Sequence, residues 1–131
     1  MNLWFVSAGL LSLITALIHV FLGGPEIHDV VQGSDLSLMS RSVSAVVWHF
    51  VTALLIINGA LMILAAFVHK LVPAVLLSVV QYVAFGAIFI AYDIARYGDL
   101  LAMPQWTLFG LISLCALVGV LRSRRAPSQR F

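Results

Sequence analysis

Four apolar stretches follow one another along the chain, separated by short polar segments. A transmembrane helix needs about 20 predominantly apolar residues to cross a hydrocarbon core about 30 Å thick. We therefore predict an all-α fold, a four-helix transmembrane bundle that forms a single domain over residues 1–131. The expected elements are helices over about 3–22, 43–67, 71–96 and 104–122, an outer loop over 23–42 and a cytoplasmic tail over 123–131.

The composition indicates that lipid, rather than water, surrounds these helices. The chain has 131 residues, of which 63% are hydrophobic and only 9% are charged, whereas a water-soluble domain carries about 25% charged residues. A water-soluble fold of this size has too little interior to hide so much apolar surface. The single cysteine, Cys115, excludes a disulfide within the chain.

The basic residues predict how the bundle is oriented. Short connections between four helices give an up-down-up-down arrangement with both termini on the same side. Lys and Arg concentrate in the cytoplasmic loops of membrane proteins, and five fall on the terminal side against two on the other. We predict a multi-pass protein of a bacterial inner membrane, N-in/C-in. The five are Lys70, Arg122, Arg124, Arg125 and Arg130, and the two are Arg41 and Arg96.

The remaining ionisable residues concentrate on the opposite, outer side of the predicted bundle. All five acidic residues and three of the four histidines fall there. Ionisable side chains within membrane spans usually face the bundle interior, where they have a partner. We therefore expect His19, His49 and Asp93, from three helices, to converge on a polar pocket at the outer (periplasmic) face. The two small-residue faces expected to bring the histidines together are Ala8, Ser12, Thr15, Ala16, His19 and Gly23, and Ser42, Ala45, His49, Thr52, Ala53 and Ala60.

Three interpretations of this pocket stay open. Imidazole and carboxylate ligands suit Zn, Cu or non-haem Fe, so the first is a transition-metal site of His19, His49 and Asp93. Glu26 or His28, from the loop "GGPEIHD", would close that site. The second interpretation is a single b-type haem with His19 and His49 as axial ligands.

The third interpretation is that these residues only hydrogen-bond and that nothing is bound. Asp93 would then pair with its helical neighbours Arg96 or Tyr97. The chain would be an accessory or structural subunit of a membrane complex, or a homo-oligomer.

No motif in the chain assigns an enzymatic activity. The sequence contains no GxSxG elbow and no glycine-rich phosphate loop, so we assign no catalytic residue. The expected surroundings are the lipid bilayer, with no nucleic-acid partner. Asn58 and Gln81, deep in their helices, are predicted to hydrogen-bond between helices, and the loop over 23–42 is long enough to hold a short interfacial helix.

Two stretches carry a resemblance. "ALIHVFLGGPEI" followed by "VVWHFVTALLIINGALMI" resembles small four-span bacterial inner-membrane proteins of unknown function. The fragment H-x-x-x-G-G, which begins at His19, also resembles the spans of membrane proteins linked to copper resistance. The resemblance implies a multi-pass helical fold and assigns no family.

Overall fold

The computed structural model describes residues 1–125, in which all regular elements are helical. Four long helices account for most of the chain, in agreement with the predicted all-α fold. Each is long and apolar enough to cross a membrane. They are α1 (Leu3–Phe21), α3 (Leu38–Ala65), α4 (Val72–Arg96) and α5 (Gln105–Arg125).

Three short elements connect the long helices. A π-helical turn, η1 (Gly24–His28), and the short helix α2 (Asp29–Gln32) lie between α1 and α3, where the sequence predicts a loop with a short helix. The 3₁₀ turn η2 (His69–Leu71) precedes α4. The predicted tail begins inside α5, and its part beyond Arg125 lies outside the described residues.

The predicted helix boundaries lie within two residues of the structure, except at the start of α3 and at the end of α5, which continues to Arg125. This helix begins at Leu38 rather than at residue 43. The hydroxyl of Ser37 accepts a hydrogen bond from the backbone N–H of Ser40, at 3.1 Å, and so caps the helix N-terminus. The polar residues of the expected loop therefore continue α3 beyond its apolar stretch.

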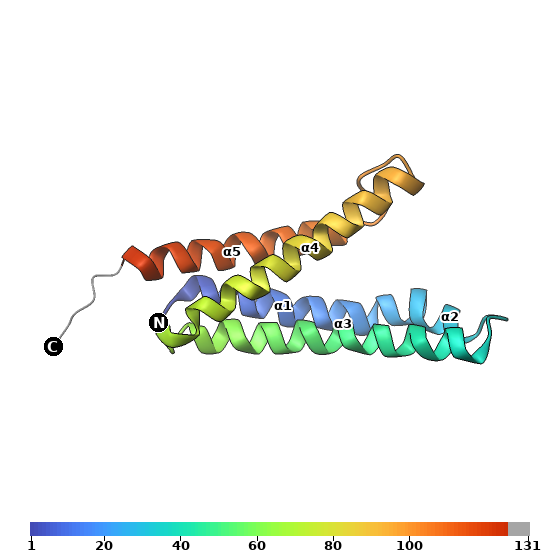
Figure 1. Cartoon of the computed structure of the whole chain (residues 1–131), viewed down its shortest axis with the longest axis horizontal. Helices are drawn as coiled ribbons and strands as arrows, with labels where there is room; N and C mark the ends of the chain where they lie inside the picture. The colour runs from blue at the N-terminus through green and yellow to red at the C-terminus, as the bar shows by residue number, and fades with distance from the viewer. Residues whose placement is uncertain (126–131) are drawn as a thin grey trace.

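Asn2 fastens three segments together at one end of the molecule. Its backbone N–H donates to the carbonyl oxygen of Ala66, at 3.0 Å. Its side-chain Nδ2 donates to the carbonyl oxygen of Gly119 and to the hydroxyl of Ser123, at 2.8 and 2.9 Å. The start of α1, the α3–α4 connection and the end of α5 therefore lie together (Figure 1), and we call this the inner end of the molecule.

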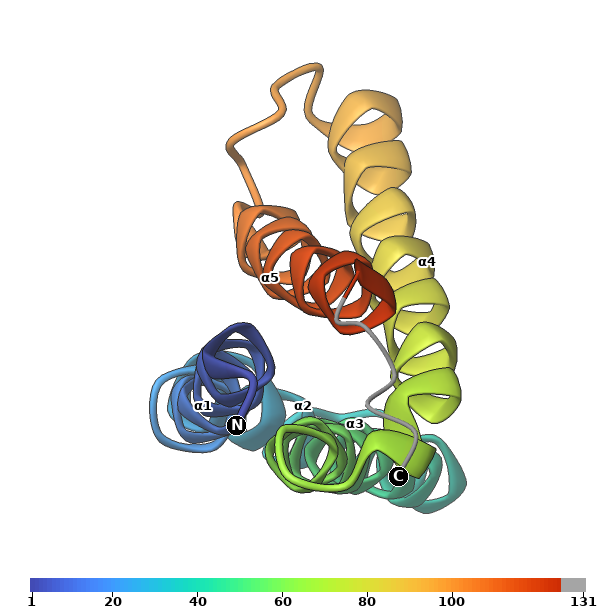
Figure 2. The ribbon, with the colours of Figure 1, turned by 90° about the vertical axis from the view of Figure 1, so that its left-hand side faces the viewer.

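The core lies toward this inner end. The buried residues of α3 begin only at Leu55, and those of α1 lie between Phe5 and Ala16. Toward the other end, the α4–α5 hairpin diverges from the α1–α3 hairpin, and the two views show its loop well apart from α2 (Figures 1 and 2). The molecule is therefore two helical hairpins joined at their inner halves. We call the end that holds the α1–α3 and α4–α5 connections the outer end.

Helices α1 and α3 approach closely where two glycines face each other. A Cβ atom built on Gly9 would lie 2.6 Å from the carbonyl oxygen of Gly59, and one built on Gly59 would lie 3.0 Å from that of Gly9. The predicted small-residue face of α1 is confirmed, since its inner members are buried. They are Ala8, Ser12, Thr15 and Ala16.

The small-residue face predicted for the second helix is correct only in part, since Ala45 and Thr52 are half-buried. Ser42, His49, Ala53 and Ala60 are exposed, whereas the buried side of α3 carries Leu55, Asn58, Gly59, Met62 and Ala65. Large side chains such as Leu55 and Met62 fill the space between helices and make more contacts there than alanines would. His49 is consequently exposed on α3 rather than buried between the helices.

Candidate functional site

His19 packs against α3 at the outer end of α1. Its ring stacks on the indole of Trp48, with centroids 3.8 Å apart and an interplanar angle of 20°. Its Nε2 lies 3.3 Å from the carbonyl oxygen of Trp48, and because that oxygen only accepts, Nε2 donates. His19 is partly buried, so it faces the neighbouring helix, and its Nδ1 keeps a lone pair in the neutral ring.

The turn after α1 brings His28 back over the same tryptophan. Gly23 permits this turn, because a Cβ on it would lie 3.1 Å from the Cη2 atom of Trp48. The His28 ring centroid lies 5.3 Å from that of Trp48 and 5.8 Å from that of His49. The Nδ1 atom of His28 is buried and has no hydrogen-bond partner among the described residues. We call His19, His28, Trp48 and His49 the outer histidine cluster.

Asp93 belongs to the other hairpin. It is fully buried near the outer end of α4, where its Oδ1 accepts a hydrogen bond from the backbone N–H of Met103, at 3.0 Å. Its Oδ2 has no partner within residues 1–125, and no ion pair with Arg96 is present there. Because the α4–α5 hairpin diverges at this end (Figure 1), Asp93 lies with the α4–α5 connection rather than with the histidines.

The structure thus brings together only part of the expected set. His28 and His49 are adjacent, His19 joins them through Trp48, and Glu26 is exposed on η1. Within the described part of the chain, no group of three or more His, Cys, Asp or Glu side chains is placed to share a metal ion. His19, His49 and Asp93 therefore do not form one site. Their helices would bring them together only if the outer half of α4 packed against α1 and α3, and it diverges from them (Figure 1).

Trp48 is not among the residues that the sequence predicts for this site. Its position near the outer boundary is typical of an interfacial aromatic belt, yet in the structure it is the contact shared by His19 and His28. A signal was present in the sequence, since Trp48 directly precedes His49. Trp48 is adjacent to His49 in the sequence and lies at the same depth in the bundle as His19, so its ring can contact neighbouring histidine rings.

A second polar group lies in the middle of the bundle. The side chain of Asn58 donates to Gln81 Oε1, at 2.9 Å, and accepts from the hydroxyl of Ser78, at 2.8 Å. The predicted hydrogen bonding between the helices of Asn58 and Gln81 is confirmed. Because these bonds pair the side chains with one another, we interpret this group as a structural link between α3 and α4.

A second set of hydrogen bonds joins α1 to α3 and to α4. The hydroxyl of Ser12 donates to the carbonyl oxygen of Leu55, at 2.6 Å, and lies 2.5 Å from the hydroxyl of Tyr82. A serine has one hydroxyl proton, so Tyr82 is the donor in the second bond. Tyr82 also stacks on Phe109, with centroids 5.7 Å apart, which holds α5 to the same point.

In comparisons with known proteins, no family model matches the chain, and neither a curated protein nor a solved structure is significantly similar to it. The class of protein therefore rests on the fold itself. Four long apolar helices with outward-facing Leu, Ile, Val and Phe side chains are typical of a multi-pass membrane protein.

Proposed function

We propose that this chain is a multi-pass protein of a bacterial inner membrane that binds a transition-metal ion at its outer end. In this proposal the helices cross the membrane up-down-up-down and both termini are cytoplasmic. The excess of Lys and Arg at the inner end supports this orientation. The outer histidine cluster would then face the periplasm.

The observation that carries the proposal is the pair formed by His28 and His49. Two imidazoles that share one ion at the usual N–metal distance, about 2.0–2.1 Å, place their ring centroids roughly 5–6.5 Å apart. The observed separation is 5.8 Å. The buried Nδ1 of His28, for which residues 1–125 offer no partner, supplies an available donor atom. His19 stacks on Trp48 and so holds in place the indole ring against which His28 packs.

The chemistry of the donors defines the class of ion. Imidazole nitrogen suits Zn, Cu, Fe and Ni. Two protein ligands leave positions for water, for the exposed carboxylate of Glu26 or for a small ligand. Since protons and metal ions compete for the imidazole nitrogen, binding should weaken as the pH is lowered.

Metal titration of the full chain, purified in mild detergent, tests the proposal. We expect one Zn²⁺ or Cu²⁺ ion per chain, measured by calorimetry and elemental analysis. His28→Ala and His49→Ala should each weaken binding by at least ~100-fold, since the loss of even an outer-shell partner weakens metal sites by about 10–100-fold. His69→Ala, at the inner end, is the matched control and should bind as the parent does.

Two results would contradict the metal proposal. One is equal metal binding by the parent and both variants. The other is a Soret absorption band that disappears in His19→Ala and His49→Ala, which would indicate b-type haem instead.

A second candidate function is supported by the open outer half of α3. No residue of α3 before Leu55 is buried, and Val46, Val47 and Phe50 are exposed there. An accessory subunit, or one copy of a homo-oligomer, would cover this surface with another helix. A stoichiometric partner in native purification, together with no bound metal, would favour this function over the first.

A further inference from the structure

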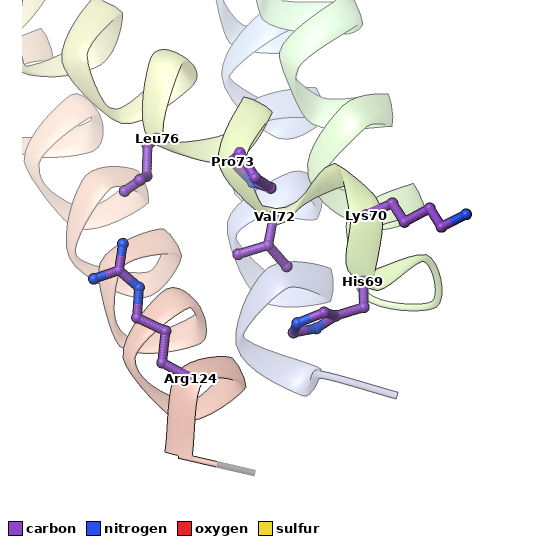
Figure 3. Close-up of a pocket in the computed structure, with 6 residues that line it drawn as sticks. All are labelled: His69, Lys70, Val72, Pro73, Leu76 and Arg124. Atoms are coloured by element: carbon purple, nitrogen blue, oxygen red, sulfur yellow. The ribbon is translucent and has the colours of Figure 1, made fainter. Parts of the chain in front are cut away.

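The inner end of the molecule contains two neighbouring cavities that share His69. The first, of about 360 Å³, lies between η2, the start of α4 and the end of α5 (Figure 3). The second, of about 500 Å³, lies beside the start of α1 and the end of α3. Both are open to the surface of the molecule, and their volumes fall in the range of ligand sites, ~300–1,000 Å³. This region is separate from the outer histidine cluster.

Cationic side chains surround these cavities. Arg124 extends from α5 along the gap toward Leu76, and His69 points into the same gap, while Lys70 extends away from Arg124 (Figure 3). In the second cavity, the guanidinium of Arg122 lies 5.2 Å above the ring of Trp4. An aromatic face holds that charge in place without an acidic partner.

No acidic side chain is available to neutralise this end. All five Asp and Glu residues of the sequence, Glu26, Asp29, Asp35, Asp93 and Asp99, lie on η1, on α2 or near the outer ends of the helices. The described residues form no ion pair with Arg124 or Lys70. The inner end therefore carries a concentrated positive charge, which favours the binding of an external anion.

The walls of the first cavity are apolar and continue onto the outer surface of α4. Val72, Pro73 and Leu76 line the cavity, and farther along the helix Leu77 and Val80 are 68% and 65% exposed. A free inorganic phosphate would gain nothing from such walls. A phosphate that carries acyl chains would place its charge against Arg124 and its chains along α4.

From this arrangement we infer that the inner end is a binding site for the headgroup of an anionic phospholipid. The headgroup phosphate binds Arg124 and His69, and the acyl chains lie on the apolar surface of α4. Basic pockets between membrane helices recognise anionic headgroups in this way. A zwitterionic lipid is disfavoured, because the cavity offers no carboxylate to its ammonium group. The inference requires only that the helices lie in a membrane and is independent of metal binding.

Native mass spectrometry of the full chain in mild detergent tests this site. The probes are phosphatidylglycerol and phosphatidylcholine with identical acyl chains, added at equal concentrations. We expect several-fold more phosphatidylglycerol to be retained. Arg124→Gln should reduce that preference by about fivefold, the contribution of one cation near an anionic lipid surface. Arg96→Gln, which removes a cation at the outer end, is the matched control and should preserve it.

A second measurement guards against variants that fold poorly. Phosphatidylglycerol should raise the midpoint of thermal unfolding of the parent and of Arg96→Gln more than that of Arg124→Gln. Equal retention of the two lipids by the parent would overturn the inference. So would an unchanged preference in Arg124→Gln. If excess inorganic phosphate displaces phosphatidylglycerol, the site recognises free phosphate and the lipid assignment is wrong.

Discussion

At the scale of single residues, the buried polar side chains of the described part of the chain differ in whether they have a hydrogen-bond partner. Asn58 has partners, through its bonds with Gln81 and Ser78. Ser113 differs, since it is buried and its hydroxyl has no partner within residues 1–125. Burial alone therefore does not tell which polar residues stabilise the bundle, and the hydrogen bonds do.

This difference predicts that two apolar substitutions will change the free energy of unfolding differently. Asn58→Leu should lower the free energy of unfolding by about 1 kcal/mol, because a hydrogen bond between membrane helices contributes about that much. It also leaves Ser78 and Gln81 without their partner. Ser113→Ala should be neutral or slightly stabilising. Reversible unfolding in mixed detergent micelles measures both, and equal losses in the two variants would contradict the assignment of Asn58 as a link.

The residues of the candidate site show what a sequence can and cannot predict. His19 was expected to face a neighbouring helix, and it does, because an imidazole at that depth needs a polar partner. Its partner is a backbone carbonyl of Trp48, which no side-chain pattern encodes. The proximity of His28 to His49 depends on the path of a π-helical turn, and that path follows from packing on Trp48 rather than from local sequence preference.

At the scale of elements, helix length was predictable and helix faces were predictable only in part. The length of an apolar stretch follows from bilayer thickness, so the bounds of α1 and α4 agree with prediction to within one residue at each end. The buried face of α3 was not predictable from its small residues. Two sides of that helix carry small residues, and only the side with Gly59 meets a glycine on α1.

The close approach of α1 and α3 predicts that two glycine substitutions will behave differently. Gly9→Ala should destabilise the bundle by about 1–3 kcal/mol, the usual effect of inserting a methyl group into a packed site. The new Cβ would lie 2.6 Å from both the Gly59 carbonyl oxygen and Ile63 Cγ1. Gly110→Ala, on α5, meets no atom within 4 Å and should be neutral or stabilising, because alanine is the better helix former.

Thermal unfolding followed by circular dichroism in detergent compares these two variants directly. Both add the same methyl group inside a long helix, so intrinsic helix preference cancels in the comparison. Similar midpoints for Gly9→Ala and Gly110→Ala would contradict the close contact between α1 and α3.

At the scale of the whole molecule, charge is divided between the two ends, and the two hairpins pack against each other in their inner halves. Asn2 ties α1, α3 and α5 together at the inner end, whereas the outer halves of the two hairpins diverge (Figure 1). Hydrophobic patterning fixes how deep each helix sits in a membrane, but it does not fix the angle between hairpins. The expectation that Asp93 joins the histidines depended on that angle.

The division of charge predicts the orientation of the chain and how to disturb it. Lys and Arg are retained on the cytoplasmic side during insertion, whereas Asp and Glu contribute little. A fluorescent protein fused to the C-terminus should therefore fluoresce, and alkaline phosphatase fused there should be inactive.

Replacing Arg122, Arg124 and Arg125 by Gln while changing Asp35 to Arg reverses the balance of basic residues from five against two to two against three. This variant should show alkaline phosphatase activity at the C-terminus in a fraction of molecules, whereas Asp29→Asn and Asp35→Asn should leave the orientation of the parent unchanged. Strong phosphatase activity of the parent fusion would place the inner end in the periplasm, and the outer histidine cluster would then face the cytoplasm.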